Sequence, residues 1–165
     1  MTKEISLYRK NIVDLIIPYA KKDKRIYLLV CDMGFGVADK FKAELPDRIF
    51  NVGMMEQGTV SIAAGMAMTG LIPIVYSIVN FLAFRSLEQV RNDVVRQELN
   101  VKFIATGVND YFANLGYSHC CGQDDKRLME LVGLKVFDPY VKKPADFKRL
   151  VKQWLTDKKP GYMRV

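Results

Sequence analysis

The sequence predicts an α/β fold, in which a mostly parallel sheet carries helices on both faces. Short apolar runs that are typical of buried strands alternate along the chain with longer segments of helical periodicity. This alternation implies helical crossovers, which are the connections that parallel neighbours in a sheet require. With 165 residues, half of them hydrophobic, the chain has enough apolar side chains for one substantial core. We therefore expect a single domain over residues 1–165.

The amino-terminal half supplies the first two predicted strands. Apolar side chains between residues 5 and 16 fall on one helix face, and the run 26–31 is typical of a buried strand. A helix of small residues is expected at 59–69 and a strand at 73–76. Because the helix is rich in Ala and Gly, another backbone can approach it closely. It is expected either to pack inside the domain or to face a partner chain.

The carboxyl-terminal half continues the alternation. Helices are expected over 85–96, 124–132 and 144–155, and strands over 101–105, 134–137 and a short terminal segment. In parallel sheets covered on both faces, ligands bind beyond the carboxyl ends of the strands. Asp32 and Gly107 follow two of these strands, and the loop to His119 leaves from the same edge, so we expect the site there.

The composition narrows the location and the class of site. The longest apolar stretch, 71–84, is interrupted by polar residues and is shorter than the roughly 20 residues of a membrane helix. The chain begins without a secretory pattern, so a cytoplasmic location is expected. Three cysteines are too few for a disulfide framework, and a single histidine without a second cysteine pair argues against a zinc site.

The net charge of +7 makes nucleic-acid binding an alternative class of function. Lys and Arg residues are dispersed, however, with concentrations at 21–25 and 142–159, and aromatic residues are not interleaved with them. This arrangement favours a basic surface that meets an acidic partner or a phosphorylated ligand. A nucleic-acid-binding domain would instead bind any duplex with a steep dependence on salt.

Glu56, in the run Val52–Gly58, is the principal candidate for chemistry. It precedes the small-residue helix expected at 59–69, and a carboxylate at the mouth of such a helix can be partly desolvated. Desolvation suits the carboxylate to exchange a proton with a bound heterocycle. The alternative is a glutamate that only stabilises the start of the helix through its macrodipole.

The residues around Glu56 carry a resemblance to a known family. Before Glu56 stands Pro46–Gly53, and after it come Ile62–Ala67, Gly70, Pro73, Phe81 and Arg85. In this order they resemble the pyrimidine-binding domain of the transketolase family of thiamine diphosphate enzymes. Asp32, His119 and the closing segment Pro160–Val165 match as well, so the resemblance covers nearly the whole chain. It implies the thiamine diphosphate-binding fold, as a pyrimidine-type domain.

The resemblance implies a group of cofactor-binding residues. The family glutamate that Glu56 matches hydrogen-bonds the aminopyrimidine ring of thiamine diphosphate and favours its imino tautomer, which makes Glu56 a catalytic candidate too. Phe81 matches an aromatic residue that stacks on this ring, with Ile78 and Arg85 beside it, and Asp32 matches an acidic residue at the border of the site. The alternatives are ordinary core packing for Phe81 and a turn at a strand end for Asp32.

The resemblance also implies substrate contacts. His119 matches a histidine that contacts the reacting part of the donor, so it is a catalytic and substrate-binding candidate. Arg9 matches an arginine that binds the phosphate of sugar substrates. A structural histidine and a surface helix arginine are the alternatives. Other substrate-reading positions of the family are replaced here, which leaves donor and acceptor open; they are Gly36, Gly107, Leu115 and Asp138.

The resemblance further implies a partner subunit. The family holds the diphosphate through Mg²⁺ at a Gly-Asp-Gly segment, which does not occur in this sequence, and family members continue into further domains. We therefore expect a separate diphosphate-binding transketolase-like subunit that holds the Mg²⁺. A 2+2 heterotetramer is the simplest closed arrangement.

Together these features predict the pyrimidine-binding subunit of a two-component, thiamine diphosphate-dependent transketolase-like enzyme. It would transfer a two-carbon ketol or acyl unit between carbonyl compounds, and only with its partner. The alternatives are a deoxyxylulose-phosphate-synthase-like or 2-oxoacid-dehydrogenase-like subunit, and a non-catalytic regulatory or interaction module of the same fold. Neither a nucleic acid nor a membrane is an expected partner.

Overall fold

The computed structural model describes residues 2–141 and 146–165, and the strands of this part of the chain form one sheet in the order β2-β1-β3-β4-β6-β5. Every pair of neighbouring strands is parallel. The strands are β1 (Ile26–Val30), β2 (Ile49–Asn51), β3 (Ile72–Ile78), β4 (Lys102–Thr106), β5 (Lys135–Phe137) and β6 (Gly161–Arg164). The predicted fold class is therefore confirmed.

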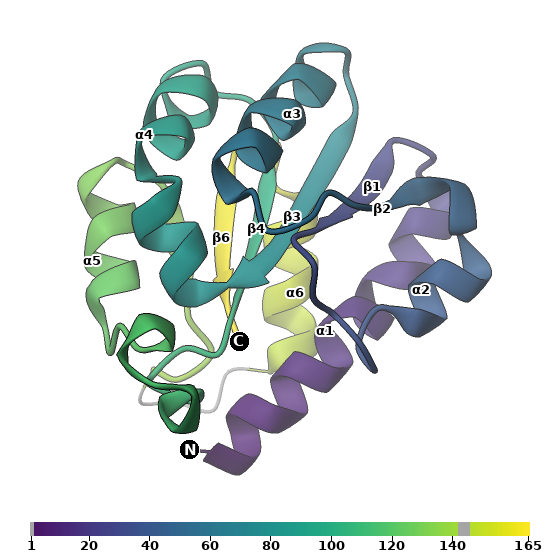
Figure 1. Ribbon diagram of the computed structural model, residues 1–165. Coiled ribbons are helices and arrows are strands. Elements are labelled where there is room, and N and C mark those ends of the chain that lie inside the picture. The colour runs from purple at the N-terminus through teal and green to yellow at the C-terminus, as the bar shows by residue number, and fades with distance from the viewer. Residues whose placement is uncertain (1, 142–145) are drawn as a thin grey trace.

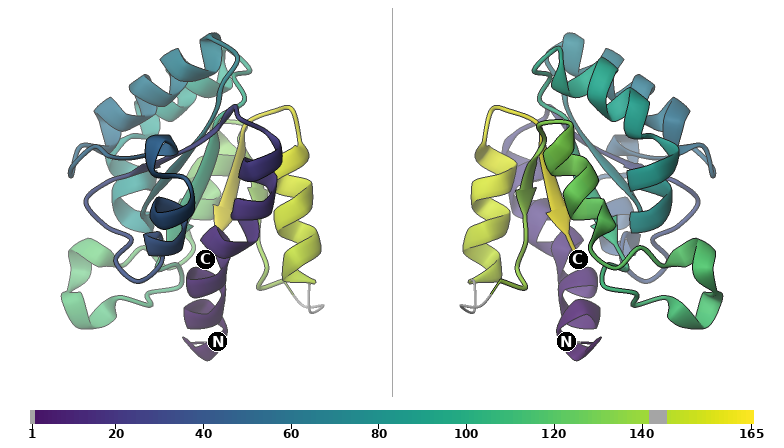
Figure 2. Two further views of the ribbon diagram at one scale, coloured as in Figure 1. Left: turned by 90° about the vertical axis from the view of Figure 1, so that its right-hand side faces the viewer. Right: turned by 90° about the vertical axis from the view of Figure 1, so that its left-hand side faces the viewer.

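Helices cover both faces of this sheet (Figure 1). The helices are α1 (Thr2–Lys22), α2 (Asp39–Glu44), α3 (Glu56–Met68), α4 (Leu87–Gln89), α5 (Asp124–Leu131) and α6 (Phe147–Thr156). π-Helical turns flank α4, namely η2 (Phe81–Arg85) and η3 (Val90–Val95). The side views place α1 and α6 on one face and α3 with α4 on the other (Figure 2). Within the described residues, no helix combines the length and apolar character needed to cross a membrane.

The core is split by the sheet into two layers. Neighbouring strand residues point to opposite faces, so Ile74 and Tyr76 pack with α1, α2 and α6, whereas Val75 packs with α3 and the segment around α4. In β4, Ile104 joins the first layer and Phe103 joins the second. Both faces of the central strands are buried, which explains why they read as continuous apolar runs rather than as alternating ones.

The boundary of α3 differs from the prediction in a way that matters for Glu56. The helix begins at Glu56 and not at Thr59, so Glu56 is its first residue rather than a residue that precedes it. The first turn is closed by Thr59, whose backbone N–H donates to the Met55 carbonyl at 2.9 Å and whose hydroxyl donates to the same oxygen at 2.9 Å. The sequence did not predict this first turn as helical, because it contains Gly58, a poor helix former.

Two elements of the first half were not predicted. Strand β2 lies at the edge of the sheet, and its three residues are half-buried or exposed, so it shows no apolar run. Helix α2 is short, and Phe41 is its single buried residue. Neither element has enough apolar periodicity to be read from sequence.

The helical predictions of the second half hold in outline. The segment predicted as a helix over 85–96 begins earlier, at Phe81, with a π-helical turn. The prediction over 144–155 falls partly outside the described residues; α6 itself begins at Phe147, where the Asp146 carboxylate accepts a hydrogen bond from the Arg149 backbone N–H at 3.3 Å. Asp146 thus caps the amino end of α6.

Candidate functional site

The predicted site residues lie at the carboxyl edge of the sheet, where β3 and β4 end side by side. Ile78, the last residue of β3, is half-buried and stands opposite Thr106, the last residue of β4. From Ile78 the chain turns into the π-helical segment with Phe81, and from Thr106 it enters residues 107–123, here named the His119 loop. The two segments that carry the predicted aromatic and histidine side chains thus leave the sheet from adjacent points.

Glu56 is a buried carboxylate with two partners on this chain. Its side chain is 1% exposed. The Ser77 hydroxyl donates to Oε1 at 2.8 Å, and the Arg85 guanidinium forms an ion pair with Oε2. At the first position of α3 the carboxylate also meets the positive end of the helix dipole. Since a carboxylate offers about four lone-pair positions, the two bonds leave Glu56 able to accept another donor.

Ser77 is a site residue that sequence reasoning missed. It is fully buried in β3, one residue before Ile78, and its hydroxyl donates a hydrogen bond to Glu56. The available signal was a lone serine inside an apolar run, where a hydroxyl needs a hydrogen-bond partner. Nothing in the sequence said that this partner would be Glu56.

Phe81 joins the carboxylate to the predicted histidine. The Arg85 guanidinium carbon lies 4.4 Å from the centre of the Phe81 ring, while Arg85 pairs with Glu56. On its other side the His119 ring approaches with centroids 5.0 Å apart, in an edge-on arrangement at 69°. Phe81 is half-buried rather than enclosed in the core, so simple core packing does not account for it.

The His119 loop presents its histidine toward this group. The Ser118 hydroxyl lies 3.0 Å from His119 Nδ1, and the Asn80 side-chain amide donates to the Ser118 carbonyl at 2.5 Å. Phe112 approaches the imidazole edge-on with centroids 6.5 Å apart. Because Nδ1 has Ser118 beside it, Nε2 is the ring nitrogen that can face a ligand.

Arg9 reaches the same edge from α1. Its Nε donates to the Thr106 hydroxyl at 2.6 Å. Its guanidinium carbon lies 4.9 Å from the Tyr111 ring centre and 4.8 Å from that of Phe112, both in the His119 loop. Arg9 is therefore half-buried at the strand ends and is not a free surface arginine.

The described hydrogen bonds of Asp32 lead to Asn51 rather than to this group. It follows β1, is exposed, and has a left-handed backbone with φ of 48°. Its backbone N–H donates to Asn51 Oδ1 at 2.9 Å, and Asn51 Nδ2 donates back to Asp32 Oδ1 at 3.2 Å. These bonds tie the carboxyl ends of β1 and β2 together, and a cofactor contact by Asp32 stays a prediction.

Two of the three thiols, those of Cys31 and Cys121, are buried. Burial raises the pKa of the Cys31 thiol, which lies 3.5 Å from the Thr59 hydroxyl in α3. Burial, with the charge of Asp125, raises the pKa of Cys121 to about 12. A raised pKa disfavours the thiolate, which is the nucleophilic form of cysteine. Among the described residues, no group of three or more His, Cys, Asp or Glu side chains could hold a metal ion.

The arrangement brings together Glu56, Arg85, Phe81, His119 and Arg9, with Ile78 at the strand end between them. A buried carboxylate that still accepts a hydrogen bond can hold a proton donor of a heterocyclic ring. A half-buried phenyl ring beside it offers a flat apolar face for that ring. This arrangement can therefore accept an N–H donor at Glu56 and offer a flat apolar face at Phe81.

Comparisons with known proteins point to one family. Residues 7–165 match the family described as "Transketolase, pyrimidine binding domain". The 6-deoxy-6-sulfo-D-fructose transketolase subunit SqwH of Clostridium sp. (strain MSTE9) is 30% identical over 158 residues, which cover 95% of this chain and 48% of that protein. An apulose-4-phosphate transketolase subunit of Phocaeicola vulgatus is 30% identical over 166 residues, covering 100% and 53%.

A solved structure has the same fold. It is described as a split gene transketolase, inactive beta4 tetramer, and it matches with a TM-score of 0.80 at 28% identity, over 94% of this chain and 49% of that one. The chain spans about half the length of the curated relatives it matches. Because the family match extends over residues 7–165, the chain belongs to the transketolase pyrimidine-binding domain family.

Proposed function

We propose that this chain is the pyrimidine-binding subunit of a two-component, thiamine diphosphate-dependent transketolase-like enzyme. It transfers a two-carbon ketol or acyl unit between carbonyl compounds and is active only with a separate diphosphate-binding subunit. Two relatives are named as transketolase subunits, and the solved tetramer of beta chains is described as inactive, which supports a requirement for a second kind of chain. The proposed site of action is the cytoplasm.

The observation that carries the proposal is the setting of Glu56. Its carboxylate is 1% exposed, is oriented by Ser77 and Arg85, and lies next to the half-buried ring of Phe81. This donor and acceptor set fits the aminopyrimidine of thiamine diphosphate, because Glu56 retains lone pairs for a ring N–H and Phe81 provides the stacking face. When bound, thiamine diphosphate supplies the carbon nucleophile and the electron sink.

The residues of this chain perform the binding and proton-handling tasks. Glu56 holds a proton between its carboxylate and the pyrimidine ring nitrogen, while Ser77 fixes the orientation of Oε1. His119 Nε2 faces the donor substrate, since Nδ1 lies beside the Ser118 hydroxyl. Arg9 provides a guanidinium at the same edge for an anionic group of the substrate. The partner holds the Mg²⁺ and the diphosphate.

The test is a reconstituted complex that carries Glu56→Gln. The full chain is co-purified with its partner in Mg²⁺ and thiamine diphosphate, and turnover is measured with ketose phosphate and 2-oxoacid donors. Loss of a positioned proton acceptor is expected to lower kcat by roughly 100-fold or more. Retained turnover in Glu56→Gln would sink the assignment.

A matched control separates catalysis from folding. Glu130, in α5, is exposed and lies outside the site, so Glu130→Gln makes the same chemical change without touching Glu56. We expect full turnover in Glu130→Gln and normal assembly in both variants. A wild-type complex that forms but retains no thiamine diphosphate would instead favour the non-catalytic interaction module.

A further inference from the structure

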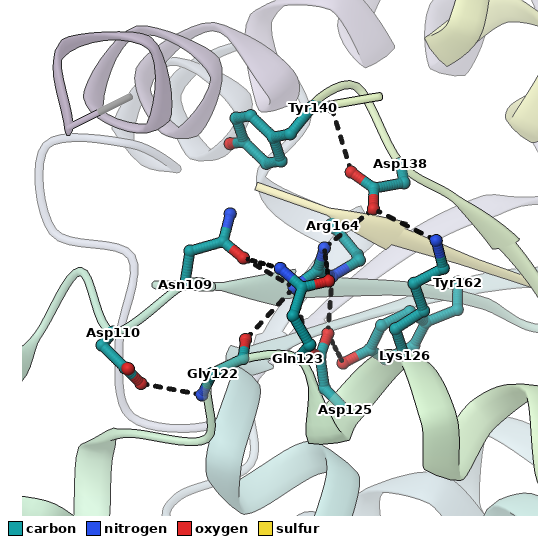
Figure 3. A network of polar contacts seen from close by, with 10 residues as sticks. All are labelled: Asn109, Asp110, Gly122, Gln123, Asp125, Lys126, Asp138, Tyr140, Tyr162 and Arg164. Carbon is teal, nitrogen blue, oxygen red and sulfur yellow. Dashed lines mark hydrogen bonds and ion pairs between the residues drawn. The ribbon is translucent and has the colours of Figure 1, made fainter. Parts of the chain in front are cut away.

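A buried arginine lies at the end of β6, outside the group around Glu56. Arg164 is fully buried, and its guanidinium forms a paired contact with Asp125, from Nε at 2.8 Å and from Nη2 at 3.0 Å. Nη1 donates to Asp138 at 2.8 Å, and Lys126 lies 3.8 Å from the same carboxylate (Figure 3). Burial alone would lower the pKa of Arg164, but hydrogen bonds and charge from Asp125 and Asp138 raise it above its ordinary value. The arginine is a permanent cation.

The same guanidinium also reaches both ends of the His119 loop. Nη2 donates to Asn109 Oδ1 at 3.1 Å, near the start of the loop, and to the Gly122 carbonyl at 3.4 Å, near its end. Nη1 lies 3.5 Å from Gln123 Oε1, and Gln123 in turn donates to Asn109 Oδ1. Figure 3 shows these side chains gathered around Arg164. Arg164 therefore joins the two ends of the loop, beside the direct bond from Gln123 to Asn109.

Two residues at this base have a left-handed backbone. Asn109 and Asp110 have φ of 52° and 58°, in the left-handed region, which Asn and Asp adopt more readily than other non-glycine residues but still infrequently. Asp110 is held by its carboxylate, which accepts from the Gly122 backbone N–H at 2.8 Å. Such conformations persist where surrounding contacts over-determine them. Here the contacts come from Arg164 and from the far end of the loop.

The middle of the loop forms two 3-10 turns but has few described contacts with the rest of the fold. Residues 113–118 are exposed, with Tyr117 at 93%, and the described hydrogen bond that ties this part to another element is the one from Asn80 to Ser118. Yet His119 is held edge-on to Phe81. The position of the imidazole thus depends on how firmly the base of the loop is closed.

We propose that Arg164 is a positioning residue for His119: by closing the base of the His119 loop it holds the imidazole against Phe81, where the proposed function requires it. Arg164 does not touch the site itself. It acts through Asn109 and Gly122, across the end of the sheet.

The test uses Asn109, because removal of Arg164 would leave Asp125 and Asp138 buried without their cation and threaten folding. Asn109→Gly deletes the acceptor while glycine accepts the left-handed backbone without strain. Asn109→Asp restores an acceptor oxygen and also tolerates that backbone. Tyr162→Phe is the control: it removes the 3.2 Å bond from Tyr162 to Asp125 on the side of the cluster away from the loop.

Two readouts need neither cofactor nor substrate. Amide hydrogen exchange of residues 110–121 in the full chain is expected to accelerate roughly tenfold in Asn109→Gly, while exchange in α5 and β6 stays unchanged. In Asn109→Asp, the exchange rate of the loop is expected to return to that of the wild type. His119 is the only histidine of the chain, so its Cε1–H resonance reports its environment alone. We expect that resonance to broaden or split in Asn109→Gly and to be restored in Asn109→Asp.

Other outcomes of these experiments would contradict the positioning role of Arg164. Unchanged exchange in the loop, or an equal increase throughout the sheet or in Tyr162→Phe, would mean that the cluster only stabilises the fold. With the partner present, kcat is expected to fall about tenfold in Asn109→Gly and to recover in Asn109→Asp. An unchanged kcat beside a loosened loop would refute the positioning role, whereas failure of the proposed function shows itself as a wild-type complex without turnover.

Discussion

The chemistry proposed for this chain depends on how single residues hold the Glu56 carboxylate. Ser77 is fully buried and Arg85 is 40% exposed, so the two partners of Glu56 work in different surroundings. If the Arg85 side chain moves away, water can take its place beside Glu56. Water cannot readily reach the buried position of the Ser77 hydroxyl, so loss of that donor would leave the buried carboxylate unsatisfied. Ser77 is therefore the constant partner and Arg85 the exchangeable one.

Replacing Ser77 with alanine tests this difference. Ser77→Ala is expected to lower the free energy of unfolding by about 2 kcal/mol and kcat by about tenfold, because Glu56 loses a buried charge-assisted bond. Denaturant titration and turnover with the partner measure the two effects. Ser61→Ala is the matched control, since Ser61 donates to Asp93 at 2.7 Å on the surface and its loss should change stability by less than about 0.5 kcal/mol. Equal effects in both variants would contradict the argument.

Single residues of the candidate site differ in how far their roles could be predicted from the sequence. Glu56, Phe81 and His119 were recognisable because they stand in a specific order of motifs along the chain. Ser77 and Arg164 were not assigned to the site, because a serine in a strand and an arginine near the end of the chain acquire their meaning only from partners far away in sequence. Asp32 was assigned to the site, but its contact with Asn51 could not be predicted, because it depends on the unpredicted strand β2.

At the scale of elements, the junction of β4 and α6 contains a buried lysine. Lys102, the first residue of β4, donates from Nζ to the Asp157 carbonyl at 2.7 Å and to the Lys159 carbonyl at 2.6 Å. It thereby satisfies the backbone that follows the carboxyl end of α6. Burial lowers the pKa of Lys102 to about 8, against partial compensation by the charge of Asp157.

This burial predicts a dependence of stability on pH. Between pH 8 and the ordinary pKa near 10.5, the unfolded chain binds more protons at Lys102 than the folded chain, so the contribution of Lys102 to stability rises with pH. From pH 7.5 to 9.5, we expect the wild type to gain on the order of 1–2 kcal/mol in unfolding free energy relative to Lys102→Met.

The difference between the wild type and Lys102→Met cancels the contributions of other groups that titrate in the same pH range. The buried thiols of Cys31 and Cys121 have raised pKa values and oppose the trend above pH 8.5, but they are present in both proteins. Denaturant titration at several pH values measures the difference. A difference that is constant over this range would show that Lys102 keeps its ordinary proton affinity in the folded chain.

At the scale of the whole molecule, α3 presents two unlike faces. Val60, Ala63 and Ala64 pack into the core, so the interpretation of this helix as part of the domain core is correct for that face. Ile62 and Met68 are exposed, at 44% and 68%. Ala63 and Ala64 thus serve the core, whereas the exposed Ser61 and Gly65 lie with the outward apolar residues on the face that is available for the partner chain of the proposed function.

This division predicts the outcome of a charge placed on the outer face. Ile62→Lys is expected to weaken assembly with the diphosphate-binding subunit at least tenfold, because a lysine that enters an interface core is left unpaired. Leu131→Lys, on α5 and 79% exposed in the wild type, is the matched control and should assemble normally. Native mass spectrometry would report both results and the expected 2+2 stoichiometry. Equal assembly of both variants would place the partner elsewhere.

The sequence by itself determined the fold class, the order of most elements and the family, because apolar periodicity and an ordered set of motifs are local properties of the chain. Tertiary structure decided the rest. It alone brought Ser77 to Glu56, set Arg9 against the His119 loop and closed that loop on Arg164. These contacts join residues that lie 21, 103 and 55 positions apart, respectively. Their partners are fixed by the parallel register of the strands, which aligns strand ends in space and leaves no trace in local pattern.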